Sequence, residues 1–324
     1  MTHHAGLSCL LLLAMVSSAA ARDTVEFYVA PDGSDAGDGS MEKPFGSLAQ
    51  ARDAVRQIRA ENVERITVFL RGGNHYLEEP VVFTSADSGG GETTIEYCAR
   101  ADEEVVISGG FELDLGWRPY RDGIVSAKVP TRIEKIDQLF VDGRRQHPAR
   151  YPNYDPEAKF FGGTSGDAIS PQRARTWTHP EGGYMHALHS AMWGSKHYEI
   201  VGVDADGTIQ FRGGWQENRG GGFDPVFRGG YHKDYLFVEN LFEELDAPGE
   251  WYFDVRTKTL YLMPEPDVDP SQAQVIGAGL KELVLIRGMA DKPVSNLHFR
   301  GLRFRHTQRI FMEPYERLLR GDWS

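Results

Sequence analysis

The chain has 324 residues and a mass of 36.3 kDa, which is room for two domains with sizeable cores. Acidic residues outnumber basic residues by 47 to 35, so the formal net charge is −12 and a general binder of nucleic acid or of anionic membrane surfaces is excluded. A hydrophobic content of 40% with 25% charged residues also excludes a disordered chain and a polytopic membrane protein.

The N-terminus has the pattern of a signal peptide. Residues 7–16 form an apolar run that is too short to span a bilayer, and small residues follow it up to Ala21. The pair Ala19 and Ala21 fits the rule for a cleavage site, so we predict a signal peptide at 1–21 and a secreted or periplasmic protein. The first residues contain no Lys or Arg, which leaves a buried N-terminal strand or helix as the alternative.

A short amphipathic helix is expected soon after the predicted cleavage site. A strand at 26–29 and a loop rich in Gly and Asp precede Ser47 and Gln50, which have the spacing of a capping box. The helix is predicted to continue to about Arg59. Its apolar stripe has helical spacing and consists of Leu48, Ala51, Val55 and Ile58.

The rest of the chain has the pattern of β-structure and contains two kinds of segment. Short β-runs separated by Gly-rich turns occupy 66–70, 81–83, 94–97 and 105–107, and similar runs return at 283–288 and 297–304. Such runs fit either a sandwich or the coils of a parallel β-solenoid. The block between them, 111–275, is less repetitive and richer in aromatic residues and His. This order suggests a domain inserted into a solenoid.

Several motifs carry a resemblance to a known family. The N-terminal part contains FYVAPDGSD at 27–35, KPF at 43–45 and LAQARDAV at 48–55, and the middle contains LFVDG at 139–143, ARYPN at 149–153, GEWYFD at 249–254 and TLYL at 259–262. Together they resemble secreted right-handed parallel β-helix glycoside hydrolases, a group that includes α-L-fucosidase- and xylanase-type enzymes in which a β-sandwich interrupts the helix.

The resemblance implies a specific architecture. We expect an all-β chain with a right-handed parallel β-helix of the pectate-lyase-like kind, an N-terminal capping helix and an inserted β-sandwich-like domain. The expected divisions are a signal peptide at 1–21, the cap and first coils at 22–110, the insertion at 111–275, and resumed but incomplete coils at 276–324. In the resembled enzymes the catalytic carboxylates lie on later coils, and no position here matches them. We therefore expect an N-terminal portion that is inactive alone, and assign no catalytic residue.

Residues suited to sugar binding gather in the middle block. Tyr184, Trp193, Tyr198 and Trp215 offer flat apolar faces to a pyranose ring, and several polar side chains nearby in the sequence can form hydrogen bonds with hydroxyl groups. Packing inside the sandwich core is the alternative. The predicted substrate-binding residues are His186, His189, Trp193, Trp215, Asn218, Arg219 and His232.

The acidic residues of this block are the other candidates for chemistry. Glu239, Glu243, Glu244 and Asp246 have helical spacing, and a solvated helix face is the favoured interpretation over catalysis. Glu250 stands next to Trp251, where an apolar ring can raise the pKa of a carboxyl group, although a structural role in a strand is favoured.

No metal or cofactor is predicted. His186 and His189 are three residues apart, but no His-Glu-x-x-His pattern supplies a zinc site. The loop with Asp32, Asp35 and Asp38 has a composition that suits calcium without the spacing of a known calcium loop.

Three functions remain open at the level of sequence. The leading hypothesis is a glycoside hydrolase acting on complex or plant-type glycans, with a poly- or oligosaccharide as partner and neither nucleic acid nor membrane. The alternatives are a polysaccharide lyase on the same fold, which would need a Lys or Arg base and usually calcium, and a noncatalytic glycan-binding or structural protein. The net charge of −12 disfavours an anionic substrate unless calcium intervenes, and the oligomeric state stays open.

Overall fold

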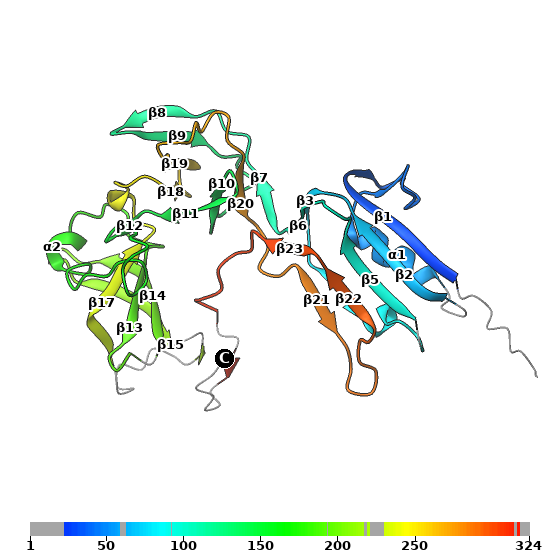
Figure 1. Cartoon of the computed structure of the whole chain (residues 1–324). Coiled ribbons are helices and arrows are strands. Elements are labelled where there is room, and N and C mark those ends of the chain that lie inside the picture. Colours follow the sequence, from blue (N-terminus) through cyan, green and yellow to red (C-terminus); the bar gives the residue numbers. More distant parts are fainter. Residues whose placement is uncertain are drawn as a thin grey trace, which may run out of the picture.

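The computed structural model of the chain describes residues 23–58, 63–91, 93–192, 194–216, 219–220, 230–313 and 316–317. The predicted signal peptide lies outside them. Nearly all regular structure in the described part is β-strand, as the sequence predicts (Figure 1). No helix of the described residues is long and apolar enough to cross a membrane.

Besides the short pair of β16 (Arg219–Gly220) with β24 (Glu316–Arg317) described below, three sheets of the described residues contain only parallel strand pairs. They are β1 (Asp23–Ser34), β2 (Val63–Leu70), β5 (Thr94–Ala99) and β22 (Leu297–Arg300) in the first, β3 (Gly73–Tyr76), β6 (Val105–Ser108) and β23 (Leu302–Arg305) in the second, and β4 (Val81–Thr84) with β21 (Val284–Arg287) in the third. The chain visits them in the order β2, β3, β4, then β5, β6, and finally β21, β22, β23. The residues between β6 and β21, 109–283, are called the excursion below. Figure 1 shows β22 beside β5, although almost 200 residues separate them in the sequence.

Equivalent side chains stack from one strand to the next in these sheets. Val68 pairs with Tyr97, and Tyr97 pairs with Phe299. The rings of Tyr97 and Phe299 are stacked with centroids 5.6 Å apart, and both contact the ring of Phe83 on β4 edge-on. These rings lie in one cluster with Val105 and Ile107 of β6, so the three sheets share a common core.

The β-runs predicted from the sequence correspond to strands of these sheets, with three differences. β1 extends through Ser34 into the predicted loop rich in Gly and Asp, and β3 begins at Gly73, in a Gly-rich stretch that reads as a turn. Residues 297–304 read as one run, but the structure divides them at Gly301, whose φ of +70° turns the chain from β22 into β23. A residue with a side chain rarely adopts this backbone conformation, so the glycine allows the change of sheet.

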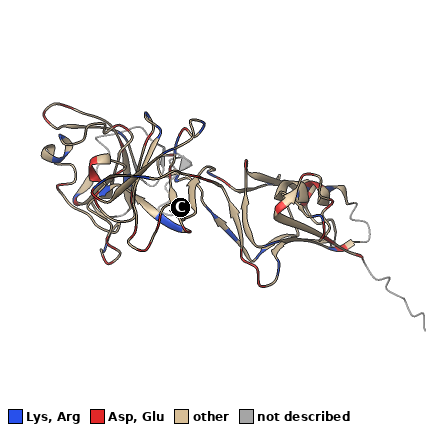
Figure 2. Ribbon diagram, turned by 90° about the horizontal axis from the view of Figure 1, so that it is seen from above, with Lys and Arg blue, Asp and Glu red and all other residues tan. Residues whose placement is uncertain are grey.

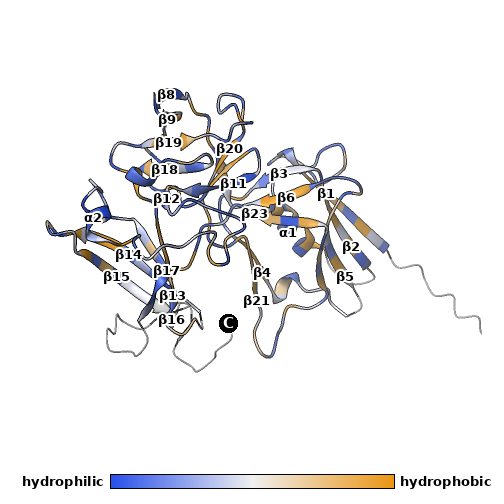
Figure 3. Ribbon diagram, turned by 60° about the vertical axis from the view of Figure 1, so that its left-hand side comes forward, coloured by the Kyte–Doolittle hydropathy of each residue, from blue (hydrophilic) through white to orange (hydrophobic). Residues whose placement is uncertain are grey.

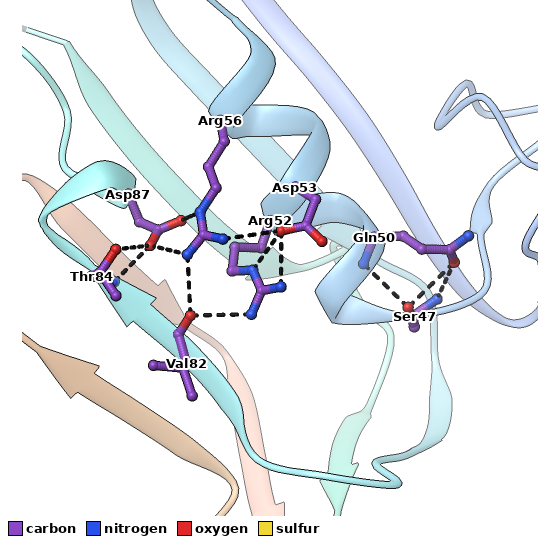
Figure 4. A network of polar contacts seen from close by, with 8 residues as sticks. All are labelled: Ser47, Gln50, Arg52, Asp53, Arg56, Val82, Thr84 and Asp87. Atoms are coloured by element: carbon purple, nitrogen blue, oxygen red, sulfur yellow. Dashed lines mark hydrogen bonds and ion pairs between the residues drawn. The ribbon is translucent and has the colours of Figure 1, made fainter.

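The predicted amphipathic helix is confirmed as α1 (Leu48–Gln57). The Ser47 hydroxyl accepts from the Gln50 amide at 3.2 Å, and the Gln50 side chain accepts from the Ser47 amide at 3.0 Å (Figure 4). The stripe Leu48, Ala51 and Val55 is buried against the parallel sheets. Figure 3 shows hydrophobic residues on α1 and on the buried strand β6.

An ion pair fixes the other end of α1. Arg56 donates from two nitrogens to the two oxygens of Asp87, each at 2.7 Å, and Asp87 is 2% exposed (Figure 4). Asp87 ends η1 (Ser85–Asp87) and also accepts from the Thr84 amide. Arg52 donates to the Val82 carbonyl at 3.1 Å, which ties the helix to β4.

Replacing the N-cap tests this part of the fold. Ser47→Ala is expected to lower the free energy of unfolding by about 1 kcal/mol, because the Gln50 amide at the start of α1 loses the hydroxyl that accepts its hydrogen bond. Urea denaturation of both proteins gives the difference. Ser190→Ala, at an exposed position, serves as the control that should match the unchanged chain. Equal stability of all three proteins would contradict a stabilising role for the cap.

The excursion between β6 and β21 forms two further sheets. The first is mixed, in the order β7 (Gly110–Glu112), β20 (Val275–Ala278), β10 (Leu139–Val141), β11 (Arg144–Pro148), β18 (Glu250–Asp254), β19 (Thr259–Met263), β9 (Ile124–Lys128) and β8 (Arg118–Arg121). The second is antiparallel, in the order β12 (Arg150–Tyr151), β17 (Tyr231–Glu239), β13 (Tyr184–His189), β14 (Ser195–Val203) and β15 (Ile209–Gln216). Each has its own buried cluster.

The remaining elements connect these parts. They are α2 (Pro171–Ala174), η2 (Phe242–Glu244) and the parallel pair of β16 (Arg219–Gly220) with β24 (Glu316–Arg317). Seen from above, the parallel sheets and the excursion form two lobes with a narrow joint, and both carry interspersed acidic and basic residues (Figure 2). The division at 110 and 275 into separate domains stays a prediction.

Candidate functional site

A small polar cleft lies where the two sheets of the excursion meet the segment that follows β23. Its volume is about 150 Å³. The residues that line it are Asp137, Gln138, Arg145, Gln146, His147, Pro148, Glu239 and Arg309. Three distant parts of the chain supply them: the two residues before β10 together with β11, the end of β17, and the segment after β23.

Arg309 joins two buried carboxylates in this cleft. Its backbone amide donates to Asp137 Oδ2 at 2.6 Å, and its guanidinium forms ion pairs with Asp137 and with Glu239 Oε1. Asp137 is 4% exposed and Glu239 is 6% exposed. Burial alone would raise the pKa of Glu239, but Arg309 and His186 outweigh it and hold this pKa below its usual value. Glu239 is therefore ionised at neutral pH.

A chain of hydrogen bonds leads from Glu239 through two histidines. His186 Nε2 lies 3.1 Å from Glu239 Oε1, the Nδ1 atoms of His186 and His197 are 2.7 Å apart, and Ser195 Oγ is 3.0 Å from His197 Nε2. An ionised Glu239 only accepts, so His186 donates from Nε2. Burial, followed by the charge of His186, lowers the pKa of His197 to about 3.

The segment after β23 covers these histidines. The ring of Phe311 lies 4.8 Å from the ring of His186 and 5.2 Å from that of His197, measured between centroids. Arg309 and Phe311 thus connect the last parallel strands to the antiparallel sheet. This arrangement fixes the orientation of the two imidazole rings and keeps water away from them.

Three of the seven predicted sugar-binding residues have described side chains, and these three do not share one surface. His186 is buried in the chain of hydrogen bonds, and His189, on the other face of β13, is buried with its Nδ1 accepting from the Ala191 amide. His232 is partly exposed and stacks on Tyr235 with centroids 4.2 Å apart.

Two of the aromatic candidates also have described positions. Tyr198 is 6% exposed in the core of the antiparallel sheet, so the packing alternative holds for it. Tyr184 lies on β13 and packs edge-on against Phe311. Trp193 and Asn218, with the side chains of Trp215 and Arg219, lie outside the described residues. A role of the seven residues in binding substrate stays a prediction.

The interpretation of the acidic cluster as a solvated helix face is wrong for two of its members. Glu239 ends strand β17, and Glu244, in the 3-10 helix η2, is 4% exposed. Glu244 pairs with Arg173 at 2.8 Å and accepts from the Trp177 indole at 2.8 Å. Arginines that are distant in the sequence neutralise both carboxylates, and local spacing does not reveal such partners.

Glu250 has the raised pKa considered from the sequence, but for a different reason. Burial raises the pKa of Glu250 to about 8, and the charge of Asp246 contributes. Trp251 is not the cause, since neighbouring side chains of β18 point to opposite faces and Trp251 belongs to the core of the mixed sheet. Glu250 Oε2 accepts from the Asp246 amide at 3.3 Å, while Oε1 is buried without a partner among the described residues.

Asp137, His147 and Arg309 were not predicted from the sequence. The signal for Asp137 is weak: a polar pair, Asp137 and Gln138, immediately precedes the fully apolar strand β10. Burial, followed by the charges of Arg150 and Arg145, lowers the pKa of His147 to about 4, so His147 is a neutral hydrogen-bonding group in the cleft. No three His, Cys, Asp or Glu of the described residues are placed to hold a metal ion.

Comparison with known proteins gives a fold but no family. No family model matches the chain, and no curated protein matches it. A solved structure named "Glycoside hydrolase" is similar with a TM-score of 0.68 and 24% identity over 88% of this chain and 51% of that one. Another, "The complex structure of XylC with xylose", gives a TM-score of 0.42 and 15% identity over 87% and 35%. The chain thus spans about half of a glycoside hydrolase whose fold it shares.

Proposed function

We propose that the chain is the N-terminal portion of a secreted carbohydrate-active protein, a glycoside hydrolase that acts on complex or plant-type glycans. The observation that carries this proposal is the fold shared with a structure named "Glycoside hydrolase" over 88% of the chain. The motifs at 27–55 and 139–262 support it independently, because they resemble the same class of enzyme.

The proposal includes a right-handed parallel β-helix. Its support is the order in which the chain visits the three parallel sheets, since a strand of each sheet recurs once per coil. Ile286 on β21 and Phe304 on β23 are 59% and 48% exposed, as expected of an end surface that a further coil covers. Residues 111–275 of the excursion are then the inserted domain.

The catalytic carboxylates are proposed to lie outside this chain. Hydrolysis of a glycosidic bond requires a carboxyl group that donates a proton and a second carboxylate about 5–10 Å away. Glu239 is held ionised by Arg309 and His186, which suits an anchoring group and not a proton donor. Because the chain spans 51% of the similar glycoside hydrolase, the remaining length can supply the pair.

A polysaccharide screen tests this proposal. The product of the complete gene and the 324-residue chain are each incubated with neutral plant polysaccharides, and new reducing ends are measured. We expect release by the complete product and none by the chain alone. Absence of release from every substrate would overturn the hydrolase and favour a binding protein. Activity that yields unsaturated ends and disappears with a chelator would instead indicate a lyase.

A further inference from the structure

A second, larger pocket lies on the outer face of the mixed sheet. Its volume is about 440 Å³, within the range of about 300–1,000 Å³ typical of small-molecule sites. It is formed by β8, by the strands β18 and β19, by η2, and by the loop at Thr178 and His179. None of its residues belongs to the polar cleft around Arg309.

Aromatic rings dominate one side of this pocket. Tyr252 and Tyr261 are paired across β18 and β19, and the ring of Tyr120 on β8 lies 5.1 Å from that of Tyr261 between centroids. Phe242 on η2 lies 4.8 Å from Tyr261 and 5.4 Å from Tyr252. Tyr120 is 48% exposed, so this cluster presents ring surface to a ligand. The C–H faces of sugar rings are apolar and pack on such rings.

Charged groups surround the rings. The guanidinium of Arg121 lies 5.6 Å from the ring centroids of Tyr120 and Phe242. Arg256 pairs with Asp254 at 3.1 Å, and Glu243 accepts from the Thr178 amide at 2.9 Å. The charges of the two arginines and the two carboxylates that line the pocket cancel. The chain as a whole has a net charge of −12. Neither the pocket nor the molecule attracts an anion, while both donors and acceptors are available to hydroxyl groups.

We propose that this pocket binds a neutral saccharide chain, with the rings of Tyr120 and Tyr261 packed against sugar faces and the charged side chains bound to hydroxyl groups. In this role the pocket holds a polysaccharide against the protein, and none of its residues is assigned a part in cleavage. Tyr120, Tyr261 and Arg121 were not predicted from the sequence, since their strands are distant along the chain and only their pairing in the sheet brings them together.

Affinity gel electrophoresis of the whole chain tests the proposal. The probes are soluble xylan and hydroxyethylcellulose as neutral polysaccharides, with sodium polygalacturonate as the anionic comparison. We expect the neutral polysaccharides to retard the chain, and Tyr120→Ala to weaken this binding about tenfold. Tyr76→Ala is the matched control, because Tyr76 is also exposed, at 38%, and lies on β3.

Three outcomes would overturn the proposal: no retardation by either neutral polysaccharide, retardation by polygalacturonate alone, or equal weakening by Tyr120→Ala and Tyr76→Ala. A thermal melt of each variant shows whether it is folded, and Arg121→Ala provides a second test at an exposed side chain. The measurement needs no turnover, so failure of the complete gene product to hydrolyse any glycan would leave this proposal standing.

Discussion

Arg309→Met is expected to lower the free energy of unfolding at neutral pH by about 3–5 kcal/mol. Arg309 compensates the buried carboxylates of Asp137 and Glu239, and methionine fills similar space without a charge. Asp137 keeps a cationic partner in the variant, because Lys135 pairs with it at 3.0 Å. The loss of stability therefore comes mainly from Glu239, which loses its arginine. Urea denaturation of the chain and the variant measures the difference.

The loss of stability in Arg309→Met is expected to be smaller at low pH. The pKa of Glu239 in the folded chain lies below its usual value of 4.5, so its contribution to stability is present above that value and is lost as the pH falls. Without Arg309, burial raises this pKa, and protonation relieves the uncompensated charge. The difference between chain and variant should therefore shrink as the pH falls through 4.5.

Two further variants control this experiment. Arg309→Met with Glu239→Gln should recover part of the lost stability, because no unpaired charge remains at that site. Arg144→Met removes a guanidinium whose ion pair with Asp267 is exposed, and should leave stability unchanged. Equal unfolding free energies for Arg309→Met and Arg144→Met would contradict the prediction. The ion pairs of Arg309 with Asp137 and Glu239 would then contribute nothing to the contact between the segment after β23 and the two excursion sheets.

Glu250→Gln is expected to stabilise the chain at alkaline pH. The pKa of Glu250 is raised to about 8 by burial, whereas its usual value is 4.5. Between these values the folded chain keeps a proton that the unfolded chain releases, so the unfolding free energy falls as the pH rises, by about 5 kcal/mol at most. Glutamine does not ionise and avoids this loss.

Denaturation at several pH values tests the prediction. The variant and the chain should differ least below pH 4.5 and most above about pH 8, with the variant more stable. Glu79→Gln, at an exposed carboxyl group, is the control and should follow the chain at every pH. Parallel curves for the chain and Glu250→Gln would show that Glu250 ionises normally.

Local patterns were sufficient to predict α1 and most strands of the parallel sheets, but not β3, whose first residues read as a Gly-rich turn. The capping box of Ser47 and Gln50, the stripe of α1 and the β-runs at 66–70, 81–83, 94–97 and 105–107 depend on neighbours within a few residues. Gly301 was missed too, because its hydrophobic neighbours continue the β-pattern through a turn between two sheets.

The polar cleft could not be predicted from local sequence patterns. Glu239 is neutralised by Arg309, 70 residues further along the chain, and Asp137 accepts from the same residue across 172 positions. Spacing within the acidic cluster predicted a solvated face because it contains no information about these partners. The raised pKa of Glu250 was anticipated, but its cause is burial in the folded chain and not the adjacent Trp251.

The mass of the products formed by the complete gene product tests the central claim of a glycoside hydrolase most directly. Hydrolysis adds one water across each broken bond, whereas elimination adds none and leaves an unsaturated end. We predict saturated oligosaccharides from a neutral plant polysaccharide. Unsaturated products, or an intact polysaccharide after prolonged incubation with the folded protein, would contradict the account.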